Sequence, residues 1–127
     1  MTGRWRGLVL VGLCALLAAC SEERAAVPPA ERSGNRYVGK QLLERYGCAA
    51  CHRIQGMPLN DSQAGPPLER IARASYVAGV LPNTQQNLER WIMHPRAVSP
   101  GTSMPDLGVS AAEARDMAAY LYSQEPR

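Results

Sequence analysis

Apolar residues recur at helical spacing in the stretch of chain that begins at about Tyr37. Val38, Leu42 and Tyr46 lie four residues apart, so they share one face of a helix. Gly47 follows directly, and glycine commonly takes the left-handed conformation just past a helix C-terminus. The pattern therefore predicts a helix over 37–46 that ends at Gly47.

A second helical pattern begins near Asn83 and Thr84, two residue types that cap helix N-termini. Gln86 follows Asn83 by three positions, which is the spacing of a capping box. The apolar face of this helix comprises Leu88, Trp91 and Ile92. We expect the helix to end at His94, because a residue that precedes a proline, here Pro95, avoids the helical region.

The third predicted helix begins at Ser110, which pairs with Glu113 in another capping box, and it ends near Ser123. Its recurring apolar residues are Ala114, Met117, Ala118 and Leu121. The alanines on this face would let another helix approach closely, and Gly39 on the first helix supplies the matching gap. We therefore expect the first and third helices to pack together.

The segments between these helices have the composition of turns and loops. Residues 53–63 predict an irregular loop, and Gly65-Pro66-Pro67-Leu68 predicts a turn before a short helix that reaches about Ala72. The sequence Pro-Gly-Thr-Ser-Met-Pro at 100–105 predicts an extended loop that displays Met104. These patterns together predict a small all-α domain with three to five helices.

The N-terminal segment has a different character. Arg4 and Arg6 give it a basic start, and the apolar run from Leu8 to Ala19 is too short to span a bilayer comfortably. We therefore expect 1–19 to be a signal peptide. The run closes in Leu17-Ala18-Ala19-Cys20, which resembles the lipobox of bacterial lipoproteins.

The lipobox resemblance implies that Cys20 becomes the lipidated N-terminus of the mature protein. The protein would then be exported and anchored in a membrane, facing the periplasm or the cell exterior. The alternative is an ordinary signal peptide, cleaved near the same small residues, that leaves Cys20 as a free thiol. Because the next stretch is rich in Ala, Glu, Arg and Pro and lacks apolar periodicity, we expect a flexible tether over 20–35 and a folded domain over 36–127.

Removal of the signal peptide changes the charge of the chain. The formal net charge of +3 falls to +1, since two of the 14 basic residues, Arg4 and Arg6, lie in that segment. No basic cluster remains in the rest of the sequence. Nucleic acid is therefore not an expected partner.

Two cysteines and a histidine stand together in Cys48-Ala49-Ala50-Cys51-His52. This spacing is the pattern of c-type haem attachment. Each cysteine can add across one vinyl group of the porphyrin, and a tight turn lets both sulfurs reach the same edge. His52 can then serve as the proximal iron ligand. The motif predicts one covalent haem c, bound through Cys48 and Cys51.

Two other kinds of site also use closely spaced cysteines. A dithiol redox motif would lie in a βαβ setting, and the surrounding sequence does not alternate like strands. A zinc site would need two more Cys or His ligands at short spacing. The rest of the chain offers Cys14, Cys20 and His94. Haem attachment is the interpretation that the sequence favours.

Further residues can complete a haem site. Pro66 has a free carbonyl, and a ligating histidine almost always donates its other ring N–H to such a group. Leu68 is a candidate wall residue, although the local sequence alone favours a plain turn for both positions. Met104 offers a thioether on a proline-stiffened loop and is the expected sixth ligand of the iron. The other candidates for that position are Met57, Met93, Met117 and His94.

These motifs resemble the class I cytochrome c family over residues 36–124, in family order. The shared features are Gly39 and Tyr46 in the first helix, the CAACH motif, Gly65-Pro66, the helix with Leu88 and Trp91, the loop around Met104, and Tyr120-Leu121 in the closing helix. The run from Leu81 to Ile92 is especially similar to the cytochrome c domain fused to subunit II of some bacterial haem–copper oxidases.

The resemblance implies a class I cytochrome c fold wrapped around one haem, with the iron held by His52 and Met104. It also implies a hydrogen bond between His52 and the Pro66 carbonyl, and terminal helices that cross at Gly39. The residues that it places near the haem propionates are Trp91 and, as weaker candidates, Arg73 and Asn83.

We expect a one-electron carrier rather than an enzyme, because iron held by His and Met stays six-coordinate in both oxidation states. No acid–base or nucleophile constellation is visible that would indicate a second catalytic site. The implied partners are a quinol–cytochrome c reductase or dehydrogenase as donor and a terminal oxidase or reductase as acceptor. One alternative is a fixed haem subunit of an oxidase or dehydrogenase complex. Another is a small haem peroxidase or gas sensor, if the bond to Met104 is labile. Since the domain is small and contains no Phe, we also expect haem to form much of its core.

Overall fold

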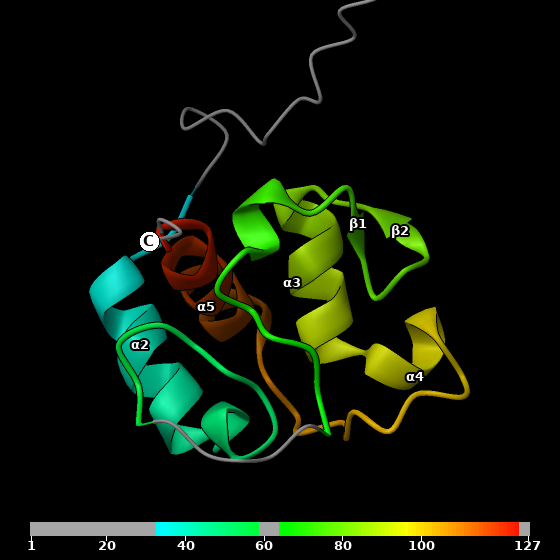
Figure 1. Ribbon diagram of the computed structural model, residues 1–127, viewed down its shortest axis with the longest axis horizontal. Helices are drawn as coiled ribbons and strands as arrows, with labels where there is room; N and C mark the ends of the chain where they lie inside the picture. Colours follow the sequence, from blue (N-terminus) through cyan, green and yellow to red (C-terminus); the bar gives the residue numbers. More distant parts are fainter. Residues whose placement is uncertain (1–32, 59–63, 125–127) are drawn as a thin grey trace, which may run out of the picture.

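The computed structural model describes residues 33–58 and 64–124 as a helical domain (Figure 1). The signal peptide and the lipidation predicted at Cys20 lie outside these residues. The elements are α2 (Arg36–Arg45), η3 (Cys48–Ala50), η4 (Ile71–Arg73), β1 (Tyr76–Val77), β2 (Leu81–Pro82), α3 (Gln85–Met93), α4 (Pro95–Val98) and α5 (Ala111–Tyr122). The predicted all-α class is confirmed, with one small two-stranded sheet added to it.

Helix α2 begins and ends through local backbone chemistry. The Asn35 side chain accepts hydrogen bonds from the amides of Tyr37 and Val38, which would otherwise lack partners in the first turn. At the other end, Gly47 has a φ of 68°, in the left-handed region, as the sequence predicts. The chain therefore turns sharply just before Cys48.

Helix α5 is the central element of the core, because α2 and α3 both pack against it. It begins with the predicted capping box, in which the Ser110 and Glu113 side chains each bond the other's backbone amide. Gly39 crosses it at Asp116, where an added Cβ would collide with the Asp116 carbonyl. The crossing that the resemblance implies at Gly39 is present.

The ends of α3 differ from the prediction in two respects. Thr84, not Asn83, is the N-cap, and it accepts a hydrogen bond from the Asn87 amide, so the predicted Asn83–Gln86 capping box is wrong. The helix does end before His94, but Pro95 also starts the short helix α4. Proline fits the first helical position because its missing N–H would lack an intrahelical partner there.

A hairpin of β1 and β2 was not predicted. Val77 pairs with Leu81 in antiparallel register across a tight turn. Both central residues of this turn have positive φ, 53° at Ala78 and 73° at Gly79. Each strand has only two residues, so no alternating pattern could develop in the sequence.

The folded unit includes Ser33–Asn35, which we call the N-terminal strap and which lies before the predicted boundary at 36. The Ser33 amide donates to Gln85 Oε1 at 2.8 Å, and Gln85 Nε2 donates to the Ser33 carbonyl at 2.6 Å. The Asn35 amide donates to Asp116 Oδ1 at 2.7 Å. These bonds tie the strap to α3 and α5. Within 33–58 and 64–124, no helix is long and apolar enough to cross a membrane.

Candidate haem-binding site

The Cys48–His52 motif lies in the tight turn that its spacing predicts. Residues Cys48–Ala50 form η3, closed by a bond of 3.2 Å from the Cys51 amide to the Cys48 carbonyl. The His52 amide reaches the same Cys48 carbonyl at 3.0 Å. This geometry brings both cysteines and the histidine into one turn directly after α2.

The two thiols of the motif have different surroundings. Cys48 is half-buried and packs against the core, whereas Cys51 is exposed. Burial raises the pKa of the Cys48 thiol, and the neighbouring Cys51 acts in the same direction. A dithiol redox motif relies on a lowered pKa that generates a thiolate. The pKa direction at Cys48 therefore argues against that alternative.

The ring of His52 is oriented by Gly65 and Pro66. Its Nδ1 lies 2.8 Å from the Pro66 carbonyl oxygen. A carbonyl only accepts, so Nδ1 must carry the proton and donate it, which leaves the Nε2 lone pair as the metal-binding group. The ring also lies directly against Gly65, where an added Cβ would collide with ring atom Cε1. A glycine is required at this position for the ring to keep its place.

Segment 65–68 is held beside the motif by its backbone. The Gly65 amide donates to the Cys51 carbonyl at 3.0 Å, and the Leu68 amide donates to the Arg53 carbonyl at 2.8 Å. These two bonds keep the Pro66 carbonyl next to His52. Leu68 is half-buried and packs against the core, in keeping with a wall position.

The candidates for the sixth iron ligand lie in different parts of the fold and differ in burial. Met104 is half-buried on an irregular segment, and its amide donates to Thr102 Oγ1 at 3.1 Å. Met57 and Met117 are buried core residues, with 7% and 0% exposure, and Met93 packs against the core from α3. His94 is exposed at the C-terminus of α3. Among these four methionines, Met104 is therefore the one that lies outside the packed core.

The residues implied near the propionates occupy three settings. Trp91 is half-buried on α3 and packs against the core. Arg73 is exposed at the end of η4. Asn83 donates both of its amide hydrogens to backbone carbonyls, those of Ile71 and Ala74.

Two tyrosine contacts that surround the motif were not predicted. Tyr46, at the end of α2, donates to Glu113 Oε2 at 3.0 Å, which joins the approach to the motif to the start of α5. Tyr120 on α5 donates to the Gln55 carbonyl at 2.7 Å, which fixes the loop that follows the motif. Both partners are more than 60 residues away in the sequence, so no local pattern could have revealed these contacts.

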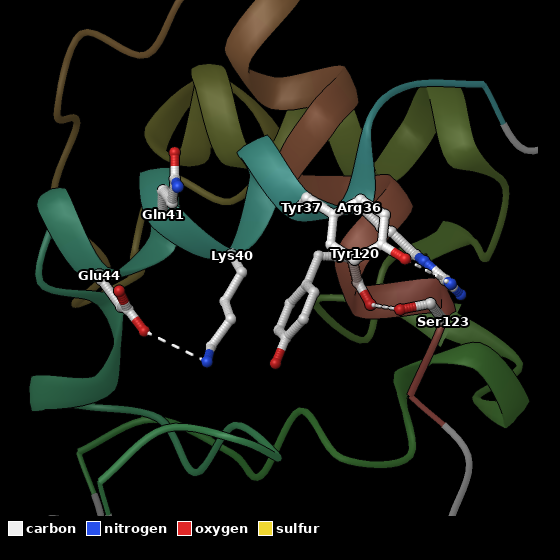
Figure 2. Close-up of a pocket in the computed structure, with 7 residues that line it drawn as sticks. All are labelled: Arg36, Tyr37, Lys40, Gln41, Glu44, Tyr120 and Ser123. Atoms are coloured by element: carbon white, nitrogen blue, oxygen red, sulfur yellow. Dashed lines mark hydrogen bonds and ion pairs between the residues drawn. The ribbon is translucent and has the colours of Figure 1, made fainter.

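A surface cavity of about 620 Å³ opens between α2 and the end of α5 (Figure 2). Its charged and polar groups bond to one another. Lys40 pairs with Glu44 at 3.7 Å, and Arg36 donates to the Tyr37 hydroxyl at 3.1 Å. Tyr120 points across the cavity toward the loop that it bonds. The cavity contains none of the predicted haem-site residues.

These observations fit covalent haem. Two free thiols in one turn can form thioethers, and an oriented imidazole presents Nε2. Within the described ranges, no group of three His, Cys, Asp or Glu side chains is placed to hold a metal ion. The fold and the site together define a small helical domain suited to covalent haem attachment.

Comparison with known proteins agrees with this class. The sequence profile of the Cytochrome c family matches residues 38–125. The chain belongs to the cytochrome c family, whose members are haem electron-transfer proteins. This membership implies haem c, and Cys48 and Cys51 lie in the expected motif.

The curated relatives that the chain matches are oxidase subunits. The chain is similar to cytochrome c oxidase subunit 2 of Alkalihalophilus pseudofirmus, with 32% identity over 96 residues, and to that of Bacillus subtilis, with 26% identity over 89 residues. These alignments cover 75% and 66% of this chain, but only 27% and 24% of the relatives. The chain thus spans about a quarter of the length of these relatives.

Proposed function

We propose that the protein is a membrane-anchored, mono-haem c-type cytochrome that carries single electrons between respiratory redox partners. In this proposal the haem is attached through Cys48 and Cys51, and the iron ligands are His52 and Met104. The hydrogen bond of 2.8 Å between His52 Nδ1 and the Pro66 carbonyl is the observation that carries the proposal. It leaves one nitrogen, Nε2, as the donor for a metal.

When bound, haem supplies an iron that changes its charge by one electron. The protein's own residues determine the reduction potential at which that change occurs. The Nδ1–H bond to Pro66 fixes the tautomer of His52 and raises the donor strength of Nε2. The Met104 thioether is a soft donor that favours the reduced state and raises the reduction potential. Leu68 and Trp91 supply apolar surface, which disfavours extra charge.

The location and partners are part of the same proposal. Cys20 carries the lipid, residues 1–19 are removed, and the domain faces the periplasm or the cell exterior. The donor is a quinol–cytochrome c reductase or dehydrogenase, and the acceptor is a terminal oxidase or reductase. A fixed haem subunit of an oxidase complex is the second candidate, favoured by the similarity to cytochrome c oxidase subunit 2.

An optical spectrum of the purified oxidised protein tests the ligand set. We expect a low-spin spectrum with a weak sulfur-to-iron charge-transfer band in the far red, and we expect Met104→Ala to lose this band. Met93→Leu is the matched control, because Met93 packs against the core from α3, and it should keep the band. A high-spin wild type that binds CO or peroxide readily would contradict the proposal and favour a peroxidase or gas sensor.

A second experiment tests the anchor and the partner. The wild type should incorporate labelled fatty acid and sediment with membranes, whereas Cys20→Ser should do neither. After solubilisation in mild detergent, a mobile carrier should migrate as a small protein. Stable co-migration with a large oxidase complex would support the fixed-subunit candidate instead.

A further inference from the structure

The Asn83 carboxamide links η4 to α5. Its Nδ2 donates to the Ile71 carbonyl at 2.7 Å and to the Ala74 carbonyl at 2.8 Å. Its Oδ1 accepts from the Tyr122 hydroxyl at 2.7 Å. The backbone amide of Asn83 also donates to Ser75 at 3.0 Å. Since a carboxamide has two donor hydrogens, both donors of Asn83 are in use.

The Tyr122 end of this arrangement is rigid. Tyr122 lies on α5, is 1% exposed and is among the largest fully buried side chains in the described part of the chain. The bond of its hydroxyl to Asn83 is therefore a contact within the core. Asn83 is thereby fixed to the central helix.

Hydrogen bonds connect η4 to His52, the proposed haem ligand. Successive turns run through the segment, with the Ile71 amide bonded to Leu68 and the Ala74 amide bonded to Ile71. Leu68 in turn bonds to Arg53, next to His52, and Pro66 accepts from His52 itself. Helix η4 also packs against α5.

We infer that Asn83 is a positioning residue for His52. It clamps η4 to α5, so that segment 66–74 is held at both ends: by Arg53 next to the motif and by Asn83 at the far end. The clamp keeps the Pro66 carbonyl at hydrogen-bond distance from Nδ1. This inference rests on the proposed function, because it assigns a consequence to the donor strength of His52.

Loss of the clamp has a predictable direction. If segment 66–74 relaxes away from the motif, the bond from Nδ1–H to Pro66 weakens and Nε2 becomes a poorer donor. A poorer donor stabilises the oxidised state less, so the midpoint potential should rise. The Nδ1–H should also exchange faster with solvent.

The experiment compares three variants in the haem-loaded full chain. The measurements are the midpoint potential, the exchange rate of the His52 Nδ1–H by NMR in the reduced state, and the unfolding midpoint. For Asn83→Ala we expect a higher potential, faster exchange and lower stability. Tyr122→Phe removes only the hydroxyl that anchors the clamp, and it should shift the same readouts in the same direction by less.

Gln85→Ala is the matched control. Gln85 is also a carboxamide at the start of α3 that bonds a backbone carbonyl, but its partner is Ser33 in the N-terminal strap. The Gln85→Ala variant should be less stable than the wild type. Its midpoint potential and the exchange rate of its His52 Nδ1–H should equal the wild-type values. If Asn83→Ala behaves like Gln85→Ala, the inference is overturned and Asn83 is merely structural.

The outcomes separate this inference from the proposed function. A wild type without a low-spin His/Met spectrum contradicts the proposed function before any variant is made. A wild type with that spectrum and no shift in Asn83→Ala overturns the positioning role alone. Should Asn83→Ala fail to load haem, the Tyr122→Phe readouts decide the question, since a wild-type potential and exchange rate there would count against the clamp.

Discussion

Gly39 on α2 and Asp116 on α5 approach so closely that no side chain fits between them. An added Cβ on Gly39 would collide with the Asp116 carbonyl and would lie 3.0 Å from the Met117 amide nitrogen, and backbone atoms cannot rotate away. The neighbouring α5 residues Ala114 and Ala118 are fully buried and small, which permits this approach. The position of the haem motif relative to α5 depends on this crossing, because the motif follows α2 directly.

Replacing Gly39 should therefore separate the two helices. We expect Gly39→Ala to lower the free energy of unfolding by about 1–3 kcal/mol, as overpacked cores do. Denaturant unfolding of the haem-loaded protein measures this change. Gly101→Ala is the control, because an added Cβ at Gly101 meets no atom within 4 Å, and its effect should be within about 0.5 kcal/mol. Equal midpoints for both variants would contradict the close crossing.

Glu113 should make stability depend on pH in the acid range. Hydrogen bonds from the Ser110 side chain and backbone, and then from Tyr46, lower the pKa of Glu113 below its usual value of 4.5. A carboxyl group with a lowered folded-state pKa stabilises the fold above its unfolded pKa, and this stabilisation is lost as the pH falls through the folded value.

The variant Glu113→Gln isolates this charge, since glutamine can keep the capping box. We expect it to be less stable than the wild type at neutral pH, with the difference shrinking as the pH falls below about 4.5. Unfolding curves from pH 3 to pH 7 measure the two profiles. Parallel profiles over this whole range would show that Glu113 has no pH-dependent role.

Tyr120 should stabilise the loop that follows the haem motif. Its hydroxyl donates to the Gln55 carbonyl at 2.7 Å. We expect Tyr120→Phe to lower the free energy of unfolding by about 1 kcal/mol, the usual net value of such a bond. Tyr37→Phe is a suitable control, because Tyr37 is 71% exposed and should contribute almost nothing. Equal losses in both variants would mean that the Gln55 contact does not hold the loop.

The haem-free chain should be poorly folded. The domain is small and contains no Phe, and apolar residues such as Leu68 and Trp91 are only partly buried. A variant with Cys48→Ser and Cys51→Ser cannot form the thioethers and provides the haem-free protein. Circular dichroism should show a large loss of helix relative to the loaded protein, and native helix content would refute the expectation.

The parts of the fold that could be predicted from the sequence are those that local chemistry determines. Helices α2, α3 and α5 carry apolar periodicity, and Ser110 with Glu113 specifies a start through two residues three positions apart. The hairpin and α4 carry no such signal, because their elements have two and four residues. Pro95 illustrates the limit, since a proline that ends one helix can equally begin the next.

Long-range partners explain what could not be predicted at the candidate site. The motif and its turn are local, and their sequence is sufficient to identify them. By contrast, Ser33 is held by Gln85, 52 residues away, and Asn83 by Tyr122, 39 residues away. The sequence indicated Asn83 as a helix cap and as a residue near the haem propionates. Only the packed structure shows that its side-chain N–H groups donate to the backbone of η4.

The N-terminal strap also sets how far the domain can travel. If Cys20 carries the lipid that we propose, the thirteen Cα–Cα steps from Cys20 to Ser33, at about 3.5 Å each, allow at most about 45 Å. That radius is about one and a half times the ~30 Å width of a small domain. Because the strap is tied to α3 and α5, every orientation pivots about that side of the molecule. The cytochrome would then stay within that distance of its anchor. Its partners would have to lie in or near the same membrane, with their electron-transfer surfaces inside that radius.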